Sequence, residues 1–220
     1  MDAIIPAAGQ ASRMRGIPKF LLPADKNYQT LIELHISQIK KYVKTIWIPV
    51  RPEFVLLLDS LNISGENIVI VPMSTNTMNE SVGRVLEISS AETFMLVMPD
   101  TVFVGEQPYE ALSKCDFAQL VCWRIREDQR GKLGQVLISD NQVIDMVDKN
   151  AMCDYEWSWG CLSFHRKLAN YIDYQDPHIG YAVRNALKNN ERIDSVKISG
   201  KYFDCGTPSE YAQLVNSTFE

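Results

Sequence analysis

The stretch IIPAAGQASRMRGIPKF, residues 4–20, begins as an apolar run and becomes a loop that holds two glycines, two arginines and a lysine. An apolar run that ends in small residues and then in cations is typical of a β-strand that leads into an anion-binding turn. The small residues, which allow a ligand to approach the backbone closely, are Ala7, Ala8 and Gly9. The polar residues that suit a polyphosphate are Ser12, Arg13 and Lys19. A surface loop with solvated cations explains the stretch equally well when it is taken alone.

Two common phosphate-loop motifs are absent from this stretch. Gly9 and Gly16 are separated by six residues and Ile17 follows, which does not match the spacing of a P-loop. Ala11 occupies the position of the second glycine of the dinucleotide fingerprint. The loop therefore supports neither a P-loop NTPase nor an NAD enzyme.

Short apolar runs alternate with amphipathic stretches as far as residue 98. The pattern predicts strands at residues 3–6, 45–50, 67–72 and 93–98 and helices at residues 30–43, 52–61 and 79–89. Strand and helix in alternation indicate an α/β fold in three layers, with a mostly parallel sheet covered by helices on both faces. In the first helix Thr30 is the expected cap, and His35 falls on the apolar face, where we expect it to pack in the core.

The pattern changes after Asp100. Strands with little helix between them are predicted at residues 117–123, 135–139 and 143–147, followed by a last strand at 196–203 and a helix at 208–215. We expect a single domain over residues 1–220, with a nucleotide-binding half over about 1–115 and a small β-rich acceptor-binding lobe within about 116–220.

Composition limits the classes of partner. The net charge of −5 and the lack of a basic patch argue against nucleic acid. No apolar run approaches the roughly 20 residues of a membrane span, so no membrane partner is expected. Five cysteines without a Cys-x-x-Cys pair indicate neither a disulfide framework nor a zinc site, and a cytoplasmic protein is expected. A homo-oligomer is left open.

Two carboxylates follow predicted strands. Asp100 comes directly after a run that must be buried, and an ionised group there is costly unless it is paired or bound to a metal. Asp204 lies between an aromatic strand end and a Gly-Thr-Pro turn, where a simple turn aspartate is the alternative. Two carboxylates near phosphate-binding cations are what Mg²⁺-assisted phosphoryl chemistry requires, so Mg²⁺ is the expected cofactor.

Together these stretches resemble the sugar-phosphate nucleotidyltransferases, such as the glucose-1-phosphate thymidylyltransferases and uridylyltransferases. Residues 4–23 resemble the signature loop of that family. Four further stretches match in the expected order: VMPD at 97–100, KLGQV at 132–136, VIDMVDKN at 143–150 and YFDCGTPSEY at 202–211. The resemblance spans essentially the whole chain and implies a Rossmann-like three-layer nucleotidyltransferase fold with a mixed central sheet.

The resemblance also implies a reaction and a set of residues. A sugar 1-phosphate would attack the α-phosphorus of a nucleoside triphosphate, with dTTP or UTP favoured, and release pyrophosphate. The residues implied as catalytic are Arg13, Lys19 and Lys149, of which Lys149 would bind the acceptor phosphate, and the metal ligands would be Asp100 and Asp204. The nucleotide would contact Ala7, Ala8, Gly9, Ser12, Thr77, Asn79 and Ser81. An anionic nucleophile needs no general base, so catalysis reduces to positioning and charge stabilisation.

The residues expected at the acceptor and the segment expected to contact the base match the family pattern less closely. The resemblance places Gly134, Asp148, Trp159 and Gly160 at the acceptor, but core packing of Trp159 is equally expected. In residues 74–82 Asn79 also suits a helix cap. Ala11 replaces a glycine of the signature loop, and Asn150 stands where the family usually has proline.

Three other readings stay open at this point. A close variant uses CTP and a small phosphate ester such as phosphocholine. A catalytically silent nucleotide-binding module would have no need of both Asp100 and Asp204. A glycosyltransferase predicts an Asp-x-Asp motif, whereas the sequence at the strand end is Asp100-Thr101-Val102.

Overall fold

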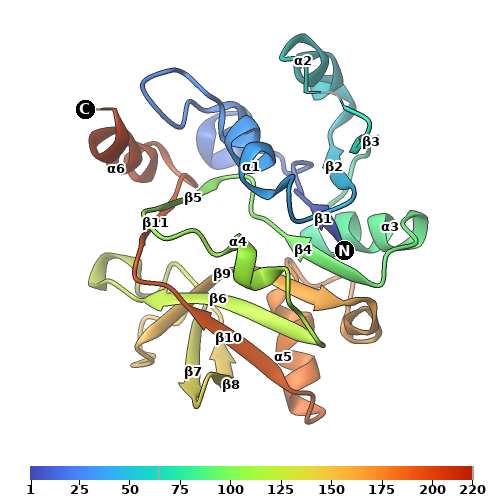
Figure 1. Ribbon diagram of the computed structural model, residues 1–220. Helices are drawn as coiled ribbons and strands as arrows, with labels where there is room; N and C mark the ends of the chain where they lie inside the picture. Colours follow the sequence, from blue (N-terminus) through green and yellow to red (C-terminus); the bar gives the residue numbers. More distant parts are fainter. Residues whose placement is uncertain (64, 220) are drawn as a thin grey trace.

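The computed structural model of the protein describes residues 1–63 and 65–219. Within these residues the chain forms a nine-stranded sheet in the order β3-β2-β1-β4-β9-β6-β10-β8-β7 and a two-stranded sheet of β11 and β5 (Figure 1). The large sheet contains β1 (Asp2–Ile4), β2 (Ile46–Val50), β3 (Ile68–Pro72), β4 (Thr93–Leu96), β6 (Ala118–Arg124), β7 (Gln135–Ser139), β8 (Gln142–Val147), β9 (Trp157–His165) and β10 (Ile193–Lys197). The small sheet pairs β5 (Thr101–Val104) with β11 (Lys201–Asp204).

Helices connect these strands. The α-helices are α1 (Leu31–Ile39), α2 (Val55–Ser60), α3 (Met78–Ile88), α4 (Tyr109–Leu112), α5 (Gly180–Lys188) and α6 (Pro208–Thr218). Short 3₁₀ helices form at η1 (Ser12–Met14), η2 (Lys19–Leu21), η3 (Pro52–Phe54), η4 (Glu127–Gln129) and η5 (Arg166–Tyr171). In the described part of the chain, no helix combines the length and the apolar character needed to cross a bilayer.

The large sheet is mixed, as expected. Strand β1 runs parallel to β2 and β4, β2 runs parallel to β3, and β10 runs parallel to β6. Strand β9 runs antiparallel to both β4 and β6 and thereby joins the two halves of the chain in one sheet. Parallel pairing thus holds among β1–β4 and between β6 and β10, whereas the other pairings of the sheet are antiparallel.

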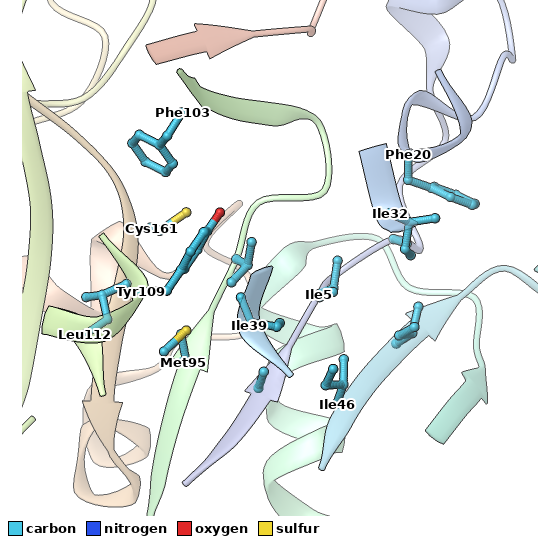
Figure 2. Packing of buried hydrophobic residues seen from close by; sticks show 14 of the residues in the cluster. Ile5, Phe20, Ile32, Ile39, Ile46, Met95, Phe103, Tyr109, Leu112 and Cys161 are labelled. Carbon is cyan, nitrogen blue, oxygen red and sulfur yellow. The ribbon is translucent and has the colours of Figure 1, made fainter. Parts of the chain in front are cut away.

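Two hydrophobic clusters cover the two faces of the sheet, which confirms the three layers. Side chains alternate along β1, so that Ala3 faces one cluster and Ile4 faces the other. The first cluster includes residues of α1, α2 and α4, and Figure 2 shows Ile32, Ile39, Tyr109 and Leu112 converging within it. The second cluster includes residues of α3 and α5.

The first helix begins and packs as its sequence predicts. Thr30 caps α1, and the Glu33 side chain accepts a hydrogen bond from the Thr30 backbone N–H, which completes a capping box. His35 is buried in the core, and this burial lowers its pKa to about 4, against weaker opposing effects of Asp100 and the Thr101 backbone.

The predicted strand at 196–203 is wrong in its extent. Strand β10 ends at Lys197, and β11 begins only at Lys201 in the other sheet. Gly200 lies in the turn between them, where a Cβ would be 2.9 Å from the Val104 carbonyl oxygen, so only glycine permits this close approach. The turn redirects the chain and sets Asp204 opposite Thr101 of β5.

The C-terminal helix packs on the N-terminal loop. Leu214 of α6 shares a small hydrophobic cluster with Met14 and Leu22. The Tyr211 hydroxyl donates to the Pro23 carbonyl oxygen at 2.9 Å. This packing holds α6 against the segment between β1 and α1, as Figure 1 shows by the blue loop beside α6.

Candidate active site

The loop after β1 offers its backbone to a ligand. The Ala7 N–H still donates to the Pro49 carbonyl oxygen, at 2.8 Å. In the part of the chain that the structure describes, the next four N–H groups, from residue 8 to residue 11, have no hydrogen-bond acceptor. Ala11 adopts the left-handed conformation with φ 49°, and its carbonyl oxygen accepts from Met14 and Gly16. A row of free amides in such a turn suits a phosphate.

These amides line a cavity of about 220 Å³ at the carboxyl end of the parallel strands. Ligands of open α/β sheets bind at this edge. The loop, η2 and the start of α3 form its walls. The lining residues include Ala7, Ala8, Gly9, Gln10, Ala11, Lys19, Thr75, Asn76, Thr77, Met78, Ser81, Pro99 and Asp100.

Lys19 and Asp100 form an ion pair at this cavity. Lys19 Nζ lies 2.8 Å from Asp100 Oδ2, although the two residues are 81 positions apart. Asp204 is a neighbour of this pair, because the Cys205 N–H donates to the Asp100 carbonyl oxygen at 2.7 Å. The two predicted carboxylates and the predicted lysine are therefore brought together.

Asp204 titrates abnormally. Burial and, after it, the negative charges of Asp100 and Glu210 raise its pKa to about 6, whereas Lys19 opposes the shift. The Asp204 Oδ1 atom accepts a hydrogen bond from the Gly206 N–H at 2.7 Å. Arg13 is exposed but reaches the same turn, since a Cβ on Gly206 would lie 3.5 Å from Arg13 Nη1. Ser12 is also exposed and does not line the cavity.

The carboxylate pair fits Mg²⁺. The charge of Asp100 is one of the causes that raise the pKa of Asp204, after burial, and two neighbouring carboxylates gain from a shared divalent cation. Across residues 1–63 and 65–219 there is no group of three or more His, Cys, Asp or Glu side chains arranged to hold a metal. Two protein carboxylates suffice for Mg²⁺ when phosphate oxygens and water complete its octahedron.

Hydroxyl groups form the wall opposite the loop. Thr75 Oγ1 and Ser81 Oγ lie 2.6 Å apart, and both residues are buried at the cavity. Thr77 caps α3 by accepting from the Glu80 N–H. Thr75 is not among the predicted site residues, because nothing in the local pattern distinguishes it from other loop threonines.

Asn79 does not lie where its predicted roles require. Thr77 is the cap of α3, so the cap prediction for Asn79 is wrong. The Asn79 side chain is 0% exposed, is absent from the cavity lining, and donates through Nδ2 to the Asp173 carbonyl oxygen at 2.9 Å. It therefore attaches residues 173–178, here called the strap, to α3.

The strap has two further attachments to the start of α3. Thr77 Oγ1 donates to the Tyr174 carbonyl oxygen at 2.9 Å, and the Met78 N–H donates to the Pro177 carbonyl oxygen at 3.1 Å. The strap ends at His178, whose Nε2 lies 3.4 Å from Asp148 Oδ1. The His178 side chain is only 19% exposed.

The predicted acceptor residues gather around β9 but are covered by aromatic rings. A Cβ on Gly134 would lie 2.4 Å from Trp159 Nε1, and a Cβ on Gly160 would lie 3.0 Å from the Tyr202 ring. Trp159 is part of a hydrophobic cluster. The close approaches that these glycines permit are therefore made by the protein's own side chains.

Lys149 lies apart from the Lys19–Asp100 pair. It is exposed, directly follows Asp148 and has a backbone in the left-handed region with φ 47°. No contact between Lys149 and Lys19, Asp100 or Asp204 is found within the residues described. His178, Tyr181 and Arg184, which lie near Asp148, are not in the predicted set, because the sequence does not show which segment packs there.

The fold and the cavity define an α/β protein with an amide-lined, lysine-bearing pocket at the carboxyl ends of its parallel strands. The chain belongs to the MobA-like NTP transferase domain family, which it matches over residues 3–173. No curated protein sequence matches the chain.

Solved structures share the fold over nearly the whole chain. A protein provisionally named as a glucose-1-phosphate thymidylyltransferase of Bacillus anthracis, solved with a sucrose, has a TM-score of 0.80 at 17% identity, covering 99% of this chain and 94% of that one. A UDP-glucose pyrophosphorylase in complex with UDP-glucose has a TM-score of 0.80 at 17% identity, covering 98% of this chain and 97% of that one. The inositol-1-phosphate CTP transferase of T. maritima has a TM-score of 0.76 at 18% identity, covering 98% of this chain and 94% of that one. These likenesses establish the nucleotidyltransferase fold.

Proposed function

We propose that this protein is a Mg²⁺-dependent nucleotidyltransferase. A phosphate oxygen of a sugar 1-phosphate or a similar phosphate ester attacks the α-phosphorus of a nucleoside triphosphate, and the bond to the pyrophosphate leaving group breaks. The observation that carries the proposal is the Lys19–Asp100 pair beside Asp204, at a cavity lined by free backbone amides.

The proposed role of each residue follows from its charge and hydrogen-bonding groups. The N–H groups of residues 8–11 bind phosphate oxygens, and Lys19 and Arg13 neutralise the charge that develops on the leaving pyrophosphate. Thr75, Thr77 and Ser81 line the same cavity and would contact the nucleoside. Lys149, being exposed and unpaired with the carboxylates, is available for the phosphate of the acceptor. The attacking oxygen is already anionic, so no residue has to accept a proton from it.

Asp100 and Asp204 would hold the metal. When bound, Mg²⁺ supplies charge neutralisation and a fixed orientation to the triphosphate. Without it the two carboxylates would repel the nucleotide, which is why the cavity needs both Lys19 and a divalent cation.

The comparisons support a phosphate-ester acceptor without selecting one. The similar structures carry the names of enzymes for glucose 1-phosphate, UDP-glucose and inositol 1-phosphate, and the last of these uses CTP by its name. We propose dTTP or UTP with a sugar 1-phosphate as the first pair to test, with CTP and a small ester such as phosphocholine as the alternative. We place the protein in the cytoplasm, where nucleoside triphosphates are available.

The test is pyrophosphate release with Mg²⁺ over a matrix of the common nucleoside triphosphates and phosphate esters. Asp100→Asn, which keeps the shape of the side chain but removes its charge, should lower kcat at least 100-fold with the productive pair. Asp116→Asn is the matched control, because Asp116 is exposed and does not line the cavity. Full activity of Asp100→Asn would overturn the metal assignment. Nucleotide binding that is equal with and without Mg²⁺, and no release with any ester, would favour a silent binding module.

A further inference from the structure

Arg13 reaches the candidate site as a long, exposed side chain. It belongs to the short helix η1, which packs on α6 through the neighbouring residue Met14. Among the residues that the structure describes, Arg13 forms no ion pair, unlike Lys19. An exposed arginine samples many rotamers and loses this freedom when it binds a ligand. A group that orients the guanidinium beforehand would therefore favour its action on a phosphate.

Three charged atoms converge on Gly206, in the turn that follows β11. A Cβ on Gly206 would lie 2.8 Å from Asp204 Oδ1, 3.2 Å from Glu210 Oε2 and 3.5 Å from Arg13 Nη1. Glycine keeps this space open, because a side chain here would collide with the Asp204 carboxylate. The guanidinium group thus lies close to two carboxylates without an ion pair to either.

The two carboxylates differ in what else they bind. Asp204 accepts a hydrogen bond from the Gly206 N–H at 2.7 Å and would hold the metal. A guanidinium that paired with Asp204 would compete with that metal for the same oxygens. Glu210 has no proposed part in metal binding, so it is the carboxylate that can attract Arg13 without this competition.

Glu210 is held in place in the first turn of α6. Its Oε2 atom accepts from Thr207 Oγ1 at 2.8 Å, and its backbone N–H donates to the same hydroxyl oxygen at 3.3 Å. A helix cap accounts for both hydrogen bonds. The cap does not require a negative charge, because a glutamine at this position could make the same two bonds. The charge of Glu210 is therefore left without a structural explanation.

We propose that Glu210 is a positioning residue, which holds the Arg13 guanidinium where pyrophosphate leaves. The inference rests on the proposed nucleotidyl transfer and adds a residue to it. The attraction acts across a short gap, so the guanidinium can turn from Glu210 to the more highly charged triphosphate when the nucleotide binds. Helix α6 then has a second role besides packing, since it orients a residue of the N-terminal loop.

The test is a double-mutant cycle on Glu210 and Arg13. Glu210→Gln keeps the size of the side chain and the acceptor for the Thr207 hydroxyl but removes the charge. It should lower kcat for pyrophosphate release about tenfold and leave KM for the nucleoside triphosphate within twofold, because Arg13 acts on charge that develops in the transition state. In the Arg13→Met background the same substitution should change kcat less than twofold.

Glu110→Gln is the matched control, because Glu110 is exposed in the first turn of another helix, α4, and should leave kcat unchanged. Urea denaturation establishes that each variant is folded. Equal losses of kcat with and without Arg13 would show that Glu210 acts through the helix cap or Asp204, and would overturn the inference. Unchanged or increased kcat in Glu210→Gln would overturn it too. Absence of pyrophosphate release by the wild type with every ester would instead overturn the proposed function, and this inference with it.

Discussion

Lys19 Nζ lies 2.8 Å from Asp100 Oδ2, and this contact joins the end of the N-terminal loop to the end of β4. Lys19 also opposes the raised pKa of Asp204. One ammonium group therefore stabilises the charged forms of two carboxylates.

Replacement of this ammonium group should impair catalysis more than folding. In Lys19→Met the two carboxylates lose their cation, and we expect kcat for pyrophosphate release to fall by about 100-fold or more. Lys26→Met is the control, since Lys26 is exposed in the loop before α1. Activity of Lys19→Met within a factor of three of the wild type would contradict the role given to Lys19.

Ala11 is strained in the loop. Its φ of 49° lies in the left-handed region, which costs a non-glycine residue roughly 1–2 kcal/mol. Glycine removes this strain but adds about 0.5–1 kcal/mol of backbone entropy to the unfolded chain. Ala11→Gly should therefore raise the free energy of unfolding by up to about 1 kcal/mol, measured by urea denaturation.

A helical alanine gives the matched control for this substitution. Ala212 is exposed in α6, and Ala212→Gly should lower the free energy of unfolding by about 1 kcal/mol. Similar losses in the two variants would show that the left-handed backbone at Ala11 is not a source of strain.

His35 should make stability depend on pH. Burial lowers its pKa from 6.5 to about 4, so between these values the unfolded chain binds a proton that the folded protein does not. The contribution is complete above pH 6.5 and is lost as the pH falls toward 4. Between pH 7.5 and pH 5 the wild type should lose roughly 2 kcal/mol more than His35→Gln, by urea denaturation at each pH. Parallel pH profiles for the two proteins would argue against a neutral, buried His35.

Sequence patterns predicted the elements whose formation depends on neighbouring residues. Alternation and amphipathic spacing located β1, β2 and β3, and the Thr30 cap followed from its neighbours. The strand predicted at 196–203 failed because the turn at Gly200 depends on the Val104 carbonyl, which comes from a distant strand. The position of Asn79 likewise depends on Asp173, 94 residues away.

The candidate site also contains features that the local sequence predicts and features that depend on distant segments. The residue types of the phosphate loop and the two carboxylates follow from the sequence, because an anion site requires small residues and cations, and a buried strand end tolerates a carboxylate only with a partner. From the sequence alone, core packing and contact with the acceptor were equally expected for Trp159. The structure shows that Gly134 and Gly180 close on the indole, a relationship that no spacing along the chain encodes.

Asn79 and Ser81 should respond to substitution in opposite ways. Asn79 attaches the strap from outside the cavity, so Asn79→Ala should lower the free energy of unfolding by about 1–3 kcal/mol, because the Asp173 carbonyl loses its donor. Nucleotide affinity should stay within threefold of the wild type. Ser81 lines the cavity, and Ser81→Ala should weaken nucleotide binding about five- to tenfold with a smaller effect on unfolding.

Urea denaturation and nucleotide titration of both variants separate the two roles. Asn170→Ala, at an exposed position of η5, controls for the loss of an asparagine. If Asn79→Ala lost nucleotide binding at unchanged stability, Asn79 would be a nucleotide ligand after all, and α3 would have to turn on binding to expose it. If it lost stability alone, the strap would be confirmed as the element that α3 holds in place, and His178 would owe its position beside Asp148 to a hydrogen bond made by Asn79 at the other end of the strap.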